Sequence, residues 1–145
     1  MRASQQQLLS IVRMAKNRLE YLTDNDWMLM MDRARRLTFA PGSPLIQERK
    51  SVRTLFLLAA GKLTVSVKGA AVAHIAPGEV CGDMAFLENS IASATVTADG
   101  DVEAYALEWS ALSDLFELYP HLASRFYRSL AVSLSRRLRQ QLVSG

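Results

Sequence analysis

The spacing of apolar residues predicts helices near the start of the chain. One apolar residue recurs every three or four positions, a spacing typical of one face of an amphipathic helix over 5–22. The residues of this stripe are Leu8, Val12, Ala15, Leu19 and Leu22. Thr23 or Asp24 then supplies a cap, so we expect a second helix in the sequence WMLMMDRARRL that follows. Its inward face is expected to hold Trp27, Met30, Met31 and Ala34.

From Thr38 the pattern changes to short β-rich segments separated by glycine and proline. We expect strands at about 45–47, 54–58, 62–68, 71–75, 94–98 and 102–107. Their close spacing, with turns such as PGS, AAGK, KGAA, PGE and ADGD, indicates an antiparallel barrel or sandwich rather than alternating βαβ units. The alternation of apolar and polar residues over 63–67 predicts one strand of a hairpin that turns at Lys68-Gly69.

Two further helices are expected after the strands. EWSALSDLFELYP is typical of a helix ended by Pro120, and the sequence from His121 to Leu142 predicts a long final helix. In that helix, leucine or phenylalanine occupies every fourth position, namely Leu122, Phe126, Leu130, Leu134, Leu138 and Leu142. Because this stripe is longer than a small barrel can cover, we expect it either to pack on the domain or to mediate a homodimer.

Composition favours a globular, soluble protein. The chain has 145 residues, of which 50% are hydrophobic, so it can form one domain with a packed core. The longest apolar run, at 55–60, stops at Gly61, well short of the about 18 residues that a membrane helix requires. The N-terminal sequence lacks the features of a secretory signal. We therefore expect a cytoplasmic location, with membrane contact only through a fused or partner protein.

The charges are distributed unevenly along the chain. Residues 69–124 hold nine acids and no lysine or arginine, whereas residues 125–145 hold five arginines and no acid. We interpret the basic end as a solvated helix face rather than a surface for lipid or nucleic acid.

Catalytic and metal-binding chemistry is not indicated. Cys81 is the single cysteine, and His74 and His121 are far apart in sequence, so we assign neither a disulfide nor a metal site. Asp83 and Glu88 are the residues most like a carboxylate pair, but we interpret them as a helix N-terminal acid and a surface residue. No nucleophile with an adjacent base and no Walker-type lysine is found, so we expect a protein that is not an enzyme and has no catalytic residue.

Four motifs, in order, carry a family resemblance. They are LTFAPGSPLIQER at 37–49, LFLLAAGKLTV at 55–65, GEVCGDMAFLENSIASATVTA at 78–98 and LSRRLR at 134–139. They resemble the patterns LTFPAGxxLIxEG, LFxLxxGxxxV, GDxFGExALLxxxxRxATVxA and LAxRLR of the cyclic nucleotide-binding domain family, which includes the catabolite activator and the regulatory subunit of protein kinase A. The likeness covers roughly residues 22–140, and residues 78–98 correspond to the phosphate-binding cassette of that family.

The resemblance implies a mainly β fold with flanking helices. We expect an antiparallel, jelly-roll-like β-roll of about eight strands, N-terminal helices, a short cassette helix and a long C-terminal helix. The expected division is an N-terminal amphipathic helix over 1–21 and a cyclic nucleotide-binding-like domain over 22–145. Within the domain, the roll covers about 38–108 and the C-terminal helices about 109–142.

The cassette is the candidate ligand site, and cAMP or cGMP is the ligand that the resemblance implies. Gly78 and Gly82 permit a tight turn, and GDMAFLEN can form one or two helical turns whose free N–H groups point at an anion. The candidate binding residues are Gly82, Asp83, Met84, Ala85, Ala92, Ser93, Ala94 and Thr95.

Two positions depart from the family pattern. Asp83 stands where the family has a glutamate that binds the ribose 2′-hydroxyl, and it is shorter by one methylene. Ala92 stands where the family has the arginine that pairs with the cyclic phosphate. Losing such a charge-assisted hydrogen bond costs about 1.5–3 kcal/mol, so cyclic nucleotide should bind about ten- to a hundredfold more weakly. Ser93 and Thr95 can donate hydroxyls but cannot neutralise the phosphate.

A replacement cation would have to come from outside residues 69–124. Lys62, Lys68 or an arginine of the final helix could supply it, and the sequence does not show which way these side chains point. The pocket of a degenerate relative can instead be filled by an apolar side chain of its own C-terminal segment, and Leu142 or Val143 could do so here.

The leading hypothesis is a non-catalytic regulatory or sensor module with weak or lost cyclic nucleotide binding, in which a lid helix over 121–142 transmits the signal. One alternative is a functional cAMP- or cGMP-binding regulatory domain of a larger transporter, channel or signalling protein. Another is the truncated sensor domain of a catabolite activator-type transcription regulator. Its helix-turn-helix would have to follow Gly145, so we expect no DNA contact from this chain alone.

Overall fold

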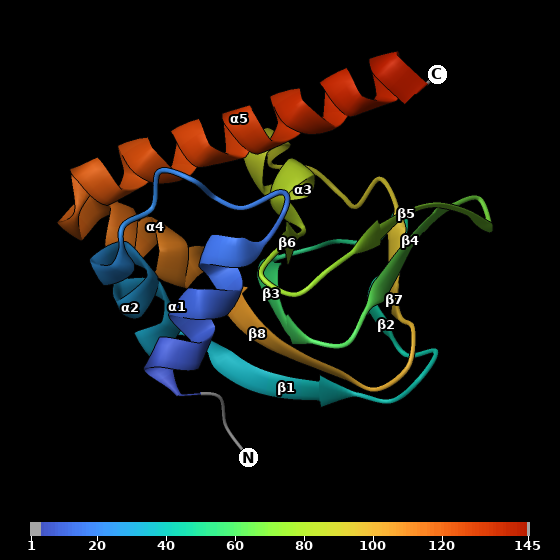
Figure 1. Ribbon diagram of the computed structural model, residues 1–145, viewed down its shortest axis with the longest axis horizontal. Coiled ribbons are helices and arrows are strands. Elements are labelled where there is room, and N and C mark those ends of the chain that lie inside the picture. Colours follow the sequence, from blue (N-terminus) through green and yellow to red (C-terminus); the bar gives the residue numbers. More distant parts are fainter. Residues whose placement is uncertain (1–3, 145) are drawn as a thin grey trace.

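The computed structural model describes residues 4–144 and shows a β-roll flanked by helices (Figure 1). The helices are α1 (Gln5–Met14), α2 (Asp24–Asp32), α3 (Asp83–Glu88), α4 (Trp109–Leu118) and α5 (Pro120–Ser144). The strands are β1 (Arg35–Phe39), β2 (Pro44–Ile46), β3 (Thr54–Ala60), β4 (Leu63–Val67), β5 (Ala70–Ile75), β6 (Val80–Cys81), β7 (Thr95–Ala98) and β8 (Val102–Glu108).

The strands form two antiparallel sheets of four strands each. One sheet has the order β1-β8-β3-β6, and the other has the order β2-β7-β4-β5. Apart from β4 and β5, which form a hairpin within the second sheet, successive strands alternate between the two sheets, which is the arrangement of a jelly-roll-like β-roll. The predicted fold class is therefore confirmed.

Strand β3 separates the two parts of the hydrophobic core. Side chains alternate between the faces of a strand. Leu55 and Leu57 contact the cluster that α1, α2, α4 and α5 form on one face, while Phe56 and Leu58 contact the cluster between the two sheets. All four side chains are buried. A strand buried on both faces reads as the continuous apolar run LFLLAA, because neither side meets solvent.

Helix α1 is shorter than its apolar stripe suggested. It ends at Met14 rather than near residue 22, although Leu19 and Leu22 are still buried. Residues 15–23, which we call the connector, run between α1 and α5 (Figure 1). The backbone N–H of Asn17 donates to Glu79 at 3.0 Å, and that of Tyr21 donates to Ser129 at 2.9 Å. In the connector, these hydrogen bonds to distant residues take the place of the hydrogen bonds within a helix. The helical spacing of apolar residues therefore continues to Leu22, although the helix itself ends at Met14.

Two strands were not predicted. The expected second helix included residues up to Leu37, but α2 ends at Asp32 and residues 35–39 form β1. This strand pairs with β8, and Arg36 Nε donates to Glu103 at 2.6 Å across the two strands. Strand β6 is only two residues long and pairs with Phe56 and Leu57, so it carries no pattern of its own. The predicted hairpin turn is confirmed, since Lys68 and Gly69 both have positive φ.

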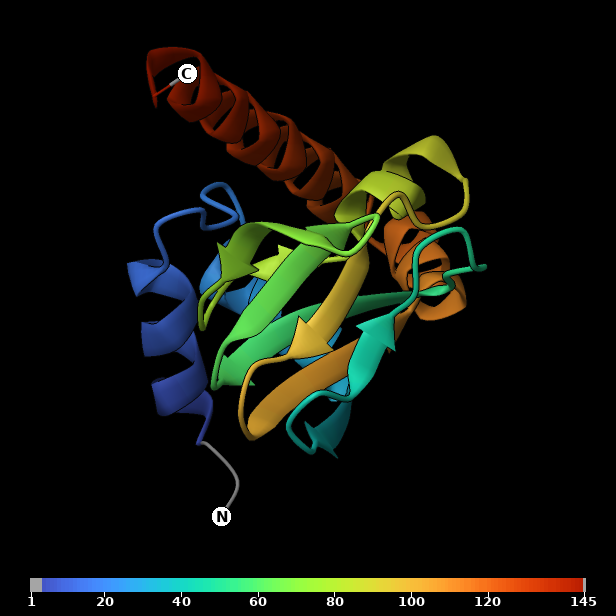
Figure 2. The same ribbon diagram turned by 90° about the vertical axis from the view of Figure 1, so that its right-hand side faces the viewer.

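Helix α5 lies along the whole of one side of the molecule, and its last turns extend past the roll (Figure 2). As expected, α4 ends just before Pro120, at Leu118 with Tyr119 as its C-cap, and Pro120 is itself the first residue of α5. Leu122, Phe126 and Leu130 are buried, whereas Leu138 is 58% and Leu142 75% exposed. A helix turns about 100° per residue, so a stripe at every fourth position drifts by about 40° each time and gradually leaves the domain. We call residues 120–133 the proximal half of α5 and residues 134–144 the distal half.

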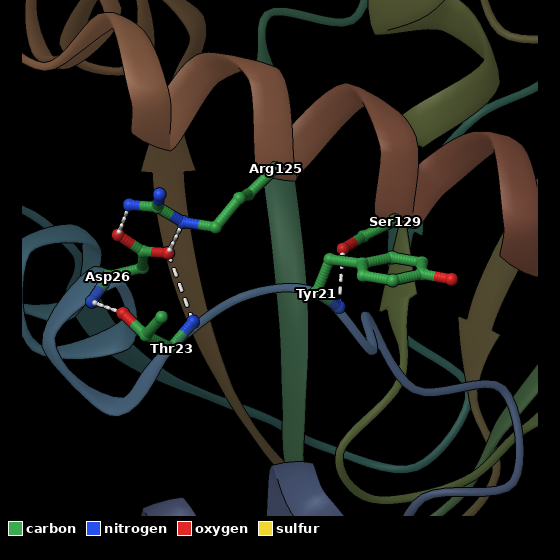
Figure 3. A network of polar contacts seen from close by, with 5 residues as sticks. All are labelled: Tyr21, Thr23, Asp26, Arg125 and Ser129. Atoms are coloured by element: carbon green, nitrogen blue, oxygen red, sulfur yellow. Dashed lines mark hydrogen bonds and ion pairs between the residues drawn. The ribbon is translucent and has the colours of Figure 1, made fainter.

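Polar contacts fix the proximal half to α2 and the connector (Figure 3). Arg125 donates two hydrogen bonds to the buried carboxylate of Asp26, at 2.7 and 2.8 Å. The backbone N–H of Thr23 also donates to Asp26, at 2.9 Å. Ser129 accepts from Tyr21 one turn further along α5. Among the described residues, no helix is long and apolar enough to cross a bilayer.

Candidate functional site

A cavity of about 590 Å³ lies where the roll, α3, the connector and the distal half of α5 meet. Seven of the eight candidate residues line it, namely Gly82, Asp83, Met84, Ala85, Ala92, Ser93 and Ala94. Thr95 does not line the cavity, and its hydroxyl accepts the backbone N–H of Glu48, in the turn after β2, at 3.0 Å. The structure therefore gathers the cassette around one cavity.

The two cassette glycines have different neighbours. Gly82 has a φ of 87°, and a Cβ there would lie 2.8 Å from the carbonyl oxygen of Thr54, so the chain can enter α3 here only with glycine. Gly78 has a φ of 90°, and a Cβ there would lie 2.4 Å from the carbonyl oxygen of Ile11 in α1. Glycine is thus needed at position 78 because α1 packs closely against the roll there. The cassette motif did not indicate this role.

Asp83 is the first residue of α3 and is almost completely buried, with 5% of its surface exposed. Its Oδ2 accepts no hydrogen bond from any residue that the structure describes. Nη1 of Arg137, on the distal half of α5, lies 3.6 Å away, which is an ion pair but too long for a hydrogen bond. Burial raises the pKa of the Asp83 carboxyl, and the positive charge of Arg137 only partly offsets this.

Ala92 is fixed by its backbone and presents only a methyl group to the cavity. Its N–H donates to the carbonyl of Lys50 at 3.0 Å, and its carbonyl accepts the N–H of Arg49 at 2.8 Å. The side chain is buried and lines the cavity. No cationic side chain of the cassette stands near it, because residues 69–124 contain no lysine or arginine.

The cations that reach the cavity come from both ends of the chain. Lys16 of the connector and Arg137 of α5 line it. Lys62 instead pairs with Asp99 at 3.2 Å, and Lys68 lies in the hairpin turn. Of the five arginines in the described part of α5, Arg137 alone lines the cavity. The sequence had left the final-helix arginines as candidates, whereas nothing in it pointed to Lys16.

Glu79 is a buried acid at the edge of the cavity with a structural role. Its carboxylate accepts the N–H of Ala76 at 2.8 Å and the N–H of Asn17 at 3.0 Å. It therefore holds the connector against the roll. A glutamate stands here in place of the aspartate of the family pattern.

The suggestion that the chain fills its own cavity is wrong. Leu142 and Val143 do not line the cavity, and they are 75% and 83% exposed. Gln140 and Gln141, on another face of the same turns, line it instead.

Cys81 lines the cavity without being reactive. Its thiol is buried, and burial together with the nearby Asp83 carboxylate raises its pKa far above the ordinary value, so it stays protonated. Among residues 4–144, no group of three or more His, Cys, Asp or Glu side chains is placed to hold a metal ion.

Comparison with known proteins identifies the family. The family model described as "Cyclic nucleotide-binding domain" matches residues 36–119, which include the whole roll after the first residue of β1 and all of the cassette. The chain belongs to the cyclic nucleotide-binding domain family. Its fold is that of the cyclic nucleotide-binding regulatory domains, a family that binds cAMP or cGMP and is generally non-catalytic.

Two curated relatives are much longer than this chain. Cyclic GMP-binding protein C of Dictyostelium discoideum is 27% identical over 128 residues, which are 85% of this chain and 5% of that protein. Glutaminase 2 of Bradyrhizobium diazoefficiens is 34% identical over 101 residues, which are 69% of this chain and 16% of that protein. The chain thus spans less than a fifth of the length of either relative.

A solved structure has the same fold. The catabolite activator protein of Thermus thermophilus superposes with a TM-score of 0.71 and is 27% identical. The match covers 87% of this chain and 60% of that protein. The family match includes the motifs at 37–49, 55–65 and 78–98 and confirms the predicted family.

Proposed function

We propose that this chain is a non-catalytic regulatory module in which occupancy of the cavity is transmitted to the distal half of α5. The observation that carries the proposal is the ion pair between Arg137 and Asp83. It joins the first residue of the cassette helix to α5 across the cavity. A ligand that contacts Asp83 changes the environment of Arg137, and so favours one position of the distal half over another.

We also propose that this cavity binds cyclic nucleotide weakly. Ala92 offers no cation at the place where the family resemblance puts the phosphate, and Asp83 is one methylene shorter than the family glutamate. Burial of a charge without a partner is costly, so we expect the affinity for cAMP or cGMP to be about ten- to a hundredfold below that of an intact cassette.

The output surface in this proposal is the exposed stripe of the distal half. Leu138, Leu142 and Val143 are 58%, 75% and 83% exposed on consecutive turns. A second copy of the chain is the partner that such a stripe suits, since the same residues on two helices can pack against each other. The match covers only a small part of each relative's length. This supports an alternative setting, in which the module controls a larger cytoplasmic or membrane-associated protein.

Calorimetric titration of cAMP and cGMP into the wild type and the Ala92→Arg variant tests this function. The substitution places a cation on the cavity wall, so we expect about a ten- to hundredfold gain in affinity for cyclic nucleotide. Ser93→Arg, at an exposed position that also lines the cavity, is a second route to the same charge if residue 92 does not tolerate the larger side chain.

Ala131→Arg is the matched control, because it adds the same side chain at an exposed position on α5 that does not line the cavity. It should leave the affinity unchanged. Micromolar or tighter binding of cAMP by the wild type would contradict the proposal of a weakened cassette. Failure of both cavity variants to gain affinity would show that missing charge is not the obstacle.

A further inference from the structure

Among the described residues that line the cavity, the buried side-chain atoms that lack a hydrogen-bond partner are both acceptors. Asp83 Oδ2 and Asn17 Oδ1 are both buried, and neither accepts a hydrogen bond from the residues that the structure describes. Both residues line the cavity, one from the cassette side and one from the connector. Leaving a buried acceptor without a donor costs about 1–3 kcal/mol, so a ligand that donates hydrogen bonds here removes a penalty that the empty protein carries.

Of the two cations that line the cavity, Arg137 is already paired with an acid. Arg137 is the nearest positive charge to the buried Asp83 carboxylate, and its side chain is 31% exposed. Lys16 is an exposed residue of the connector, so water screens its charge. An anionic ligand at this end of the cavity would compete with Asp83 for Arg137, and weakening that ion pair would leave the buried carboxylate with less compensation. An uncharged ligand does not pose this conflict.

Much of the remaining wall is apolar, although His74, Ser93 and the two glutamines of α5 also line the cavity. The apolar part includes Ile46, Val52, Val65 and Val96 of the roll. Such a wall suits the flat face of a nucleobase and not a free sugar, which has little apolar surface. The volume of about 590 Å³ lies within the range of about 300–1,000 Å³ that small-molecule sites occupy.

We propose that the preferred occupant of this cavity is an uncharged ribonucleoside rather than its 3′,5′-cyclic phosphate. The ribose hydroxyls donate to Asp83 Oδ2 and the base lies on the apolar wall, while Arg137 stays paired with Asp83. This inference rests on the proposed function, since it assigns a ligand class to the same cavity. It reverses the order of preference that the cyclic nucleotide-binding fold implies.

Titration calorimetry on the full 145-residue chain tests the order of affinity directly. The probes are adenosine, guanosine, 2′-deoxyadenosine, cAMP and cGMP. We expect at least one of the two ribonucleosides to bind about tenfold or more tightly than its cyclic phosphate. Removal of one donor in 2′-deoxyadenosine should weaken binding about tenfold relative to adenosine.

The Asp83→Asn variant gives a readout that differs in sign between the two ligand classes. The amide removes the buried charge, places a donor where Oδ2 was an acceptor, and frees Arg137. We expect nucleoside binding to weaken about tenfold and cyclic nucleotide binding to strengthen. Because this change removes a buried charge without altering side-chain size, we expect the variant to fold, and circular dichroism checks this.

The inference is overturned if the wild type binds cAMP or cGMP more tightly than either nucleoside, or binds no nucleoside. It is also overturned if Asp83→Asn shifts both ligand classes in the same direction. These results are distinct from failure of the proposed function. If Ala92→Arg gains cyclic nucleotide affinity while the wild type binds no nucleoside, the regulatory site stands and only the ligand class is wrong.

Discussion

The two halves of α5 have opposite relations to the domain. The proximal half buries Leu122, Phe126 and Leu130, and its Arg125 makes a bidentate contact with the buried carboxylate of Asp26 (Figure 3). The distal half exposes Leu138 and Leu142, and its contacts include the ion pair of Arg137 with Asp83. One continuous helix can therefore serve as a fixed element of the core at one end and as a movable lid at the other.

The contrast in burial between the two halves predicts the largest effect, a difference in the free energy of unfolding. Leu130→Ala removes a completely buried side chain, so we expect it to lower the free energy of unfolding by about 3 kcal/mol. Leu138→Ala makes the same chemical change at a side chain that is 58% exposed, and should cost less than about 0.5 kcal/mol. Urea unfolding followed by circular dichroism measures both. Equal losses would mean that the two halves are anchored alike.

The anchoring ion pair makes the stability of the protein depend on pH. Burial acts to raise the pKa of Asp26, but the hydrogen bonds from Arg125 and Thr23 outweigh it, so the pKa lies below its ordinary value. A lowered folded-state pKa contributes stability above the ordinary aspartate pKa, and this stability is lost as the pH falls through the lower folded value. We expect Asp26→Asn to be less stable than the wild type at neutral pH and the difference to shrink in acid.

Thermal unfolding at a series of pH values checks this expectation. The effect should be smaller than that of Leu130→Ala, because Arg125 is 38% exposed and water screens the pair. A difference that stays constant down to the acid end would contradict it.

The distal ion pair predicts the opposite pH behaviour. The pKa of Asp83 is already raised by burial, and Arg137→Gln removes the charge that partly offsets this, so the pKa should rise further. A raised folded-state pKa means that the native protein binds its proton more tightly, so stability declines as the pH rises from the ordinary value through the folded one. NMR titration of the Asp83 side-chain carbon measures the change. An unchanged or lowered pKa would mean that Arg137 does not act on Asp83.

Self-association is expected to depend on the distal half alone. Replacing both Leu138 and Leu142 with Ser removes the exposed stripe with little effect on the domain, so it should lower the sedimentation coefficient at high protein concentration. Replacing the exposed residues Ser124 and Ala131 of the proximal half with Asn provides the matched control and should not change it. If the wild type sediments as a monomer at every protein concentration, the proposal of a homodimer is wrong.

The sequence predicted the fold better than the extents of its helices. Motifs at 37–49, 55–65 and 78–98 were sufficient for the roll, because they carry the turns and buried strands that define it. The boundaries failed where distant contacts decide the backbone. The apolar residues at 19 and 22 kept a helical spacing, yet hydrogen bonds to Glu79 and Ser129 hold the connector out of a helix.

The site was predicted in part. The cassette side could be read from the sequence, since Asp83 and Ala92 occupy recognisable motif positions. The opposite wall could not, because Lys16 and Arg137 come from segments about 120 residues apart that meet only through the packing of α5 on the connector. At Arg49, in contrast, the sequence departs from the motif but the structure keeps the expected turn. Arg49 takes the left-handed conformation, with a φ of 67°, at a position where the family pattern has glycine, so the turn persists despite the substitution.

Hydrogen exchange along α5 in the wild type and in Asp83→Asn tests the central claim most directly. If the distal half is coupled to the cavity through Asp83 and Arg137, the amides of 134–143 should exchange roughly two- to fivefold faster in the variant, while those of 124–133 stay unchanged. Arg137→Gln should reproduce the same pattern from the other side of the contact. If the distal amides do not change, or if both halves change equally, the cavity is not coupled to the distal half and the proposed regulatory route is wrong.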